Sequence, residues 1–274
     1  MPIPKRIIQT GRTRDLCLRD RASVTALRHL HPDFAYDFFD DHDIHTFVAQ
    51  EFPDLLTVWE SFTQPIQRVD LFRYLAVYRM GGFYFDLDVL LGHSVHDLLD
   101  LECVFPFEEL SIQPYFCGHL GIDWELGNYA FGARASHPFL KALIDNCVRS
   151  RTDRQWVAQT LQGLPRVLHP EFAVLNGTGP GLVTRTWSDA PQTRADATVL
   201  FPPDVCDSAS WHQFGRYGVH LQAGSWRARG SAWQRRWGRW WEQHRRTVTL
   251  REARKLGPTR EVFAESVAVS TPGL

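Results

Sequence analysis

Hydrophobic and polar residues alternate in a regular way along residues 1–226. Short apolar runs predict strands at residues 3–9, 34–39, 129–133, 198–201 and 217–221. The stretches between them predict helices at residues 21–30, 43–52, 67–80 and 138–148. Strands that alternate with helices favour a layered α/β fold. We expect one domain here, because no stretch before residue 226 has the composition of a linker or an internal repeat.

The clearest prediction is a helix that is followed directly by a strand. In residues 67–80, Val69, Phe72, Ala76 and Met80 recur at three- and four-residue spacing, which is typical of a helix. The following Gly81-Gly82 provides a helix stop that tolerates a left-handed backbone. Residues 83–91 are then predicted to form one continuous buried strand, since their apolar run is broken at only two acidic positions.

Those acidic positions are Asp86 and Asp88. Side chains at i and i+2 of a strand share one face, so the two carboxylates should point together. Close carboxylates in an apolar run repel each other unless a proton or cation intervenes. Hard cations such as Mg²⁺ and Mn²⁺ bind carboxylate oxygens and substrate phosphates together. The alternative is a strand that ends at the surface with two solvated aspartates, and the apolar flanks argue against it.

A second type of reaction is compatible with Asp86 and Asp88. A strand that ends in two aspartates also carries the nucleophile and the acid of haloacid-dehalogenase-like phosphatases. Such enzymes place this motif on the first strand and need a second acidic pair downstream, whereas Asp40-Asp41 lies upstream. The phosphatase therefore remains the less favoured alternative.

Asp70 and Arg73 precede the acidic pair by one helix. They lie one helical turn apart, so they share nearly the same face. Either they form a surface salt bridge, or Asp70 accepts hydroxyl groups of a sugar while Arg73 binds the donor.

Composition narrows the functional classes. The 274 residues contain 30 Lys and Arg against 31 Asp and Glu, so no general charge attracts nucleic acid. Five scattered cysteines suggest neither a disulfide framework nor a zinc ribbon, and they favour a reducing compartment. No apolar run reaches the length of a signal-peptide core or a membrane span. We therefore expect a cytoplasmic location.

The C-terminal part is strongly basic and rich in tryptophan. Residues 226–255 contain ten Lys and Arg but two acidic residues. Read as a helix, residues 231–246 place their tryptophans on one face and arginines on the other. Such a helix either binds an anionic membrane surface or packs its tryptophans on the main domain. We expect a helical segment at 227–256 and a loosely held tail at 257–274.

The segment RVDLFRYLAVYRMGGFYFDLDVLLG, residues 68–92, resembles the DXD-containing sugar-binding region of glycosyltransferase family 32. This family includes yeast-type initiating mannosyltransferases and bacterial capsular and lipopolysaccharide enzymes. The resemblance extends to residues 3–10, to HPDFAYDFFDDHDIHTFV, to NYAFGARASHPFL and to HLQAGSW. One departure is Gly11-Arg12, where the family usually has a bulky aromatic residue after the preceding Gln.

The resemblance implies a GT-A fold, a Rossmann-like α/β/α sandwich with a mixed central sheet. It also implies a retaining enzyme that transfers a hexose from a UDP- or GDP-sugar to a glycan or lipid-linked acceptor. Mn²⁺ or Mg²⁺ would be the cofactor, bound by Asp86, Asp88 and His220. From the charge balance, the cysteines and the basic C-terminal segment, we expect no nucleic-acid partner and a location in the cytoplasm or peripherally at the inner face of the membrane.

The same resemblance implies the site. Asp86, Asp88, Asp70 and Arg73 would be the catalytic residues. The nucleotide-sugar would be bound by Gln9, Thr10, Asp70, Arg73, Tyr84, Asp86, Asn128, Ser225 and Trp226. Two alternatives remain open within this fold: a protein-modifying transferase of the effector type, and a non-catalytic relative that binds nucleotide-sugars.

Overall fold

The computed structural model describes residues 2–111, 113–222, 244, 247–249 and 251. Three predicted features lie outside these residues. They are the pair Ser225 and Trp226, the predicted tail, and the predicted C-terminal helical segment except for His244 and a few neighbouring residues. Among the described residues, no helix is long and apolar enough to cross a membrane.

The chain alternates strands and helices, as the sequence predicts. The strands are β1 (Arg6–Thr10), β2 (Ala35–Phe39), β3 (Gly82–Phe85), β4 (Val89–Leu91), β5 (Cys103–Leu110), β6 (Trp124–Leu126), β7 (Ala130–Ala133), β8 (Ala197–Leu200), β9 (Gln213–Phe214) and β10 (Gly218–His220). The helices are α1 (Leu18–Leu30), α2 (Asp41–Glu51), α3 (Pro53–Ser61), α4 (Pro65–Met80), α5 (Pro138–Thr152), α6 (Arg154–Gln159), α7 (His169–Leu175) and α8 (Pro180–Asp189).

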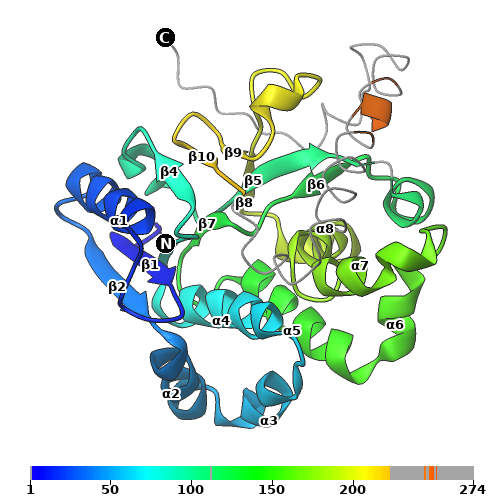
Figure 1. Cartoon of the computed structure of the whole chain (residues 1–274), viewed down its shortest axis with the longest axis horizontal. Coiled ribbons are helices and arrows are strands. Elements are labelled where there is room, and N and C mark those ends of the chain that lie inside the picture. The colour runs from blue at the N-terminus through cyan, green and yellow to red at the C-terminus, as the bar shows by residue number, and fades with distance from the viewer. Residues whose placement is uncertain (1, 112, 223–243, 245–246, 250, 252–274) are drawn as a thin grey trace.

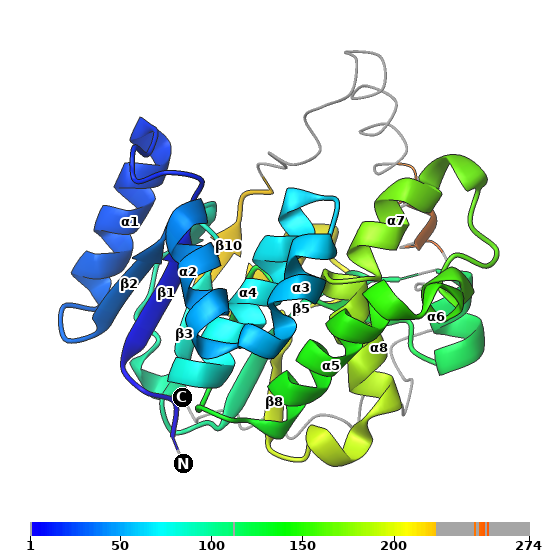
Figure 2. The same ribbon diagram turned by 90° about the horizontal axis from the view of Figure 1, so that it is seen from below.

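The main sheet is mixed. Its order is β2-β1-β3-β7-β5-β6, with β8 paired to β5. Strands β2, β1 and β3 run parallel, and β7 joins β3 antiparallel. Figure 2 shows the parallel pair of β1 and β2 beside α1. This sheet confirms the predicted α/β class with a mixed centre.

Two apolar cores hold the layers together. One joins the sheet to α4, α5 and α8 and contains Leu75, Phe105 and Phe131. The other lies on the opposite face, where Leu27 of α1 and Phe83 of β3 meet the small sheet β4-β10-β9. Figure 1 shows α1, β4 and β10 on one side of the main sheet and α4 and α5 on the other.

The turn from α4 into β3 depends on two glycines. Gly81 ends the helix at φ +68°, and Gly82 follows at φ +108°. A Cβ on Gly82 would lie 2.7 Å from the carbonyl oxygen of Arg6. A side chain is therefore excluded where β3 enters the sheet beside β1.

The continuous strand predicted over residues 83–91 is wrong. The run forms β3 in the main sheet and β4 in the small sheet, with a turn at residues 86–88. The backbone N–H of Asp86 still donates to Tyr129 O at 2.7 Å, while that of Val89 donates back to Asp86 O at 3.1 Å. The chain changes partner here, because β3 pairs with β1 and β7 whereas β4 pairs with β10.

Candidate active site

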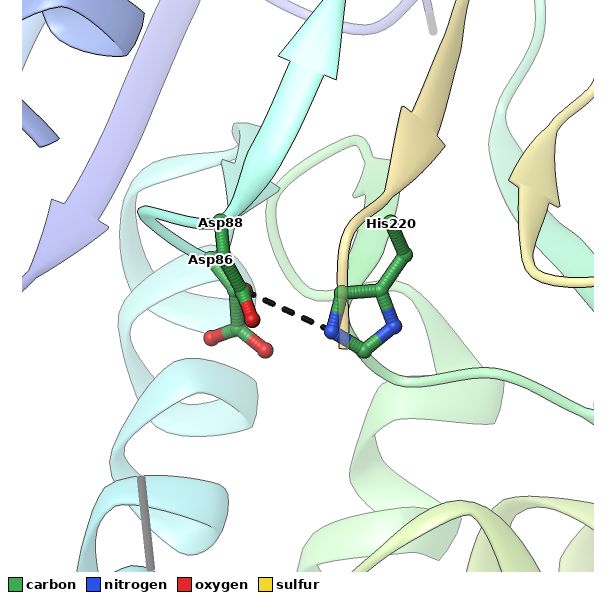
Figure 3. Close-up of side chains that lie close together, drawn as sticks. All are labelled: Asp86, Asp88 and His220. Atoms are coloured by element: carbon green, nitrogen blue, oxygen red, sulfur yellow. Dashed lines mark ion pairs between the residues drawn. The ribbon is translucent and has the colours of Figure 1, made fainter. Parts of the chain in front are cut away.

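The turn between β3 and β4 brings Asp86 and Asp88 to His220 at the end of β10. Each of the three residues offers a ligand atom, and these atoms lie within 4.8 Å of one another. The Nε2 atom of His220 is 3.4 Å from Asp88 Oδ1. Figure 3 shows both carboxylates on the side of the turn that faces the imidazole. The aspartates converge because of this turn, and the strand periodicity that predicted their convergence does not apply.

The position of His220 is set by the pairing of β4 with β10. Leu221 N donates to Asp88 O at 2.9 Å, and the ring of His220 stacks on Tyr129 with centroids 4.3 Å apart. Burial lowers the pKa of His220, but its hydrogen bond to Asp88 and the nearby carboxylates outweigh burial and raise it overall. Within the described part of the chain, the buried Nδ1 atom has no hydrogen-bond partner.

Arg73 connects this cluster to Asp70. Its guanidinium lies 3.2 Å from Asp70 Oδ1, and its two terminal nitrogens each lie 3.3 Å from one oxygen of Asp86. The side chains of Arg73 and Asp70 are only 3% and 5% exposed, so the alternative of a surface salt bridge is excluded. Burial raises the pKa of both Asp70 and Asp86, while Arg73 opposes that shift.

Asn128 adjoins the same pair. Its backbone carbonyl accepts a hydrogen bond of 2.7 Å from Arg73 Nη1, and its side-chain amide donates to Asp70 Oδ1 at 3.1 Å. Asp70, Arg73 and Asn128 thus come together as one buried polar group beside Asp86.

Gln9, Thr10 and Tyr84 lie next to Asp86 and the end of β3. Tyr84 donates to Asp86 Oδ1 at 2.8 Å, and its hydroxyl lies 2.9 Å from Thr10 Oγ1. Gln9 Nε2 donates to the Phe85 carbonyl at 3.4 Å. Gln9 and Tyr84 are fully buried, and Thr10 is nearly so. Their contacts are thus to the residues that carry Asp86, and their binding of a nucleotide stays a prediction.

Sequence reasoning missed two members of this polar group. Tyr74 and Thr178 are fully buried and bond to Asn128 and Asp70, respectively. Tyr74 could have been found, because it follows Asp70 by four residues on the same helix. Thr178 could not, since nothing in the sequence predicts that the segment before α8 packs against α4.

Comparisons with known proteins place a glycosyltransferase region in this chain. Residues 19–105 match the family model described as "Glycosyltransferase sugar-binding region containing DXD motif". The chain is 27% identical over 225 residues to inositol phosphoceramide mannosyltransferase 3 of Schizosaccharomyces pombe, covering 77% of this chain and 56% of that protein. It is 28% identical to mannosyl phosphorylinositol ceramide synthase SUR1 of Saccharomyces cerevisiae, over 70% and 44% of the two chains.

The chain therefore spans about half the length of these curated relatives. A solved structure, the ligand-free glycosyltransferase domain from the YGT toxin, matches with a TM-score of 0.50 at 8% identity. That match covers 72% of this chain and 80% of the toxin domain, and it supports the GT-A fold alone. The family model and the yeast relatives agree that the chain contains a glycosyltransferase sugar-binding region with a DXD motif, as the resemblance to family 32 implies.

Proposed function

We propose that this protein is a metal-dependent, retaining glycosyltransferase that moves a hexose from a nucleoside-diphosphate sugar to a hydroxyl group of a glycan or glycolipid. The observation that carries the proposal is the connection of two groups through Arg73. Asp86, Asp88 and His220 form a cluster suited to a cation. Arg73 contacts both Asp86 of this cluster and the buried Asp70.

The cluster has the donors that a divalent cation needs. Two carboxylates and one imidazole suit Mn²⁺ and also accept Mg²⁺, and Nε2 of His220 lies 3.4 Å from Asp88 Oδ1. Asp86, Asp88 and His220 would hold the ion. A bound cation would stabilise the negative charge of the departing diphosphate.

The chain's own residues would hold the donor sugar. Arg73 and Asp70 would fix it at the cluster, since they are rigidly placed one turn apart on α4. Transfer breaks the bond between the anomeric carbon and the phosphate oxygen. A bond from that carbon to the acceptor oxygen forms on the same face, and the acceptor's proton leaves with the diphosphate.

We propose mannose as the sugar and a glycolipid as the acceptor. The support comes from the names of the two yeast relatives, inositol phosphoceramide mannosyltransferase 3 and mannosyl phosphorylinositol ceramide synthase SUR1. Whether the nucleotide is GDP or UDP is decided by comparing the two donors in one assay.

The basic, tryptophan-rich segment at residues 231–246 supports a further part of the proposal. It would bring the enzyme to an anionic membrane that carries the acceptor, at about 1 kcal/mol for each basic residue near the surface. Co-sedimentation with vesicles containing phosphatidylserine tests this at low and high salt. Binding that is absent at low salt contradicts it.

The experiment for the function is hydrolysis of GDP- and UDP-sugars with Mn²⁺, followed by transfer to a lipid-linked acceptor. The proposal expects release of nucleoside diphosphate and of a product with retained configuration. Release of inorganic phosphate from a phosphate monoester would instead favour the phosphatase alternative. Binding of donor without turnover would favour the non-catalytic relative.

A further inference from the structure

Four buried residues, including Asp70 of the proposed sugar site, form a closed ring of hydrogen bonds. They are Asp70 and Tyr74 on α4, Asn128 after β6, and Thr178 just before α8. Asn128 donates to Asp70 Oδ1 at 3.1 Å and to the Tyr74 hydroxyl at 3.0 Å. Tyr74 donates to the Thr178 carbonyl at 2.9 Å, and Thr178 Oγ1 donates to Asp70 Oδ2 at 2.9 Å.

The direction of every bond in this ring is fixed by chemistry. The Asp70 carboxylate can only accept, so Asn128 and Thr178 must donate to it. The Thr178 carbonyl can only accept, so Tyr74 donates its single hydroxyl proton to it. The Tyr74 oxygen is then an acceptor, and Asn128 must turn its NH₂ group toward both neighbours. If the amide were flipped, its oxygen would face the carboxylate and repel it.

The ring therefore leaves Asn128 Oδ1 as the free end of the amide. That oxygen bonds to no other residue in the described part of the chain, and it is not fully buried. The backbone of Asn128 is held separately, because its carbonyl accepts from Arg73 Nη1 at 2.7 Å. Arg73 in turn contacts Asp86 of the metal cluster.

We infer that Thr178 and Tyr74 are positioning residues for transfer, and that they hold Asn128 with its side-chain oxygen toward the donor sugar. A fixed amide oxygen there can accept a hydrogen bond from a sugar hydroxyl, and its negative end faces the positive charge that develops at the anomeric carbon. Thr178 thereby acts through Asp70 and Tyr74, and Tyr74 acts through Asn128. This inference rests on the proposed function and adds two residues to it.

Substitutions of Thr178 test the inference most directly, because one keeps its hydroxyl group and the other keeps only its size and shape. Thr178→Ser keeps the donor to Asp70, while Thr178→Val keeps the volume and removes the donor. We expect Thr178→Ser to keep kcat for donor hydrolysis within about threefold and Thr178→Val to lower it by about ten- to a hundredfold. The Kd for Mn²⁺ with free nucleoside diphosphate should stay within about twofold for both variants.

Thr186→Val is the matched control for burial. Thr186 is a buried threonine on α8 that donates to the Leu182 carbonyl at 2.8 Å, away from the ring. Its removal should lower the melting temperature without lowering kcat per folded molecule. If Thr178→Val also lowers only the melting temperature, Thr178 is structural and the inference is wrong.

Tyr74→Phe keeps the test decisive if Thr178→Val does not fold. This change removes one hydroxyl and opens the ring on the side opposite Asp70. The inference predicts a reduced kcat with unchanged nucleotide affinity, and full kcat overturns it. A wild-type protein that hydrolyses no donor would instead overturn the proposed function, so the two failures are distinguishable.

Discussion

Arg73 lies 3.3 Å from each carboxylate oxygen of Asp86, through a different terminal nitrogen for each contact. The same guanidinium lies 3.2 Å from Asp70. One buried cation thus bridges the carboxylate that would bind metal and the carboxylate that would bind sugar. This bridge couples the two halves of the proposed site and gives Arg73 a structural role as well.

Arg73 variants should therefore change stability and transfer together. Arg73→Ala leaves the buried Asp70 and the partly exposed Asp86 without their cation, and we expect a loss of about 3–5 kcal/mol in the free energy of unfolding. Arg73→Lys keeps the charge but cannot form the same forked contacts, so it should fold and lose at least about tenfold in transfer. Urea unfolding and donor hydrolysis measure the two effects. Wild-type stability in Arg73→Ala contradicts the bridge.

His220 should determine metal affinity. Its side chain offers the nitrogen donor of the cluster, so His220→Ala should raise the Mn²⁺ concentration for half-maximal activity by about tenfold or more. Wild-type protein treated with EDTA should lose activity and regain it with Mn²⁺. His29→Ala changes an exposed histidine on α1 and serves as the control. An unchanged metal requirement in His220→Ala removes the histidine from the site.

His137 predicts a pH dependence of stability. It precedes α5, is 1% exposed, and its Nδ1 accepts from Phe139 N at 3.2 Å. Burial, helped by Arg134, lowers the pKa of His137 to about 4. Between about pH 6.5 and 4 the unfolded chain binds more protons at this group, so the free energy of unfolding falls as the pH drops.

The expected contribution of His137 is at most about 3 kcal/mol across that window. His137→Asn keeps a side-chain oxygen as helix cap and cannot titrate there. The difference in unfolding free energy between wild type and His137→Asn should therefore change from pH 7 to pH 4. A difference that is constant over this range means that His137 does not titrate as described.

Gly82 should resist any side chain. Its φ is +108°, and a Cβ added there would lie 2.7 Å from the Arg6 carbonyl oxygen, so Gly82→Ala should cost more than about 2 kcal/mol of unfolding free energy. Gly92→Ala is the control, since a Cβ at that glycine would meet no atom within 4 Å. Equal unfolding midpoints for the two variants would contradict the close approach of β3 to β1.

The sequence predicted the elements whose signals are local. Helix α4 followed from apolar spacing, and its end at Gly81 followed from the need for a left-handed residue. The break after Phe85 could not be predicted, because the chain changes sheets there to reach β10, a partner far along the sequence. Asp86 and Asp88 were therefore paired correctly for the wrong geometric reason.

Strand β5 was missed for a different reason. Pro106 interrupts its apolar run, and proline within a run argues against a central strand. In the structure, residues 103–104 pair with β7 and residues 107–110 pair with β6. Pro106 falls between these two sets and is the last residue in the parallel register with β8, opposite Leu200, so its missing N–H lies at the end of that pairing. Long-range pairing of this kind leaves no trace in local composition.

The most direct test of the proposed metal-dependent transfer is turnover of a nucleoside-diphosphate sugar with Mn²⁺ by wild type, Asp88→Asn and Asp145→Asn. Asp88→Asn removes one ligand charge without changing volume, whereas Asp145 forms an exposed ion pair with Lys141 on α5. We expect turnover at least about a hundredfold lower in Asp88→Asn, with an unchanged melting temperature, and full activity in Asp145→Asn. Turnover by Asp88→Asn at the wild-type rate in saturating Mn²⁺ would contradict a catalytic metal at this turn.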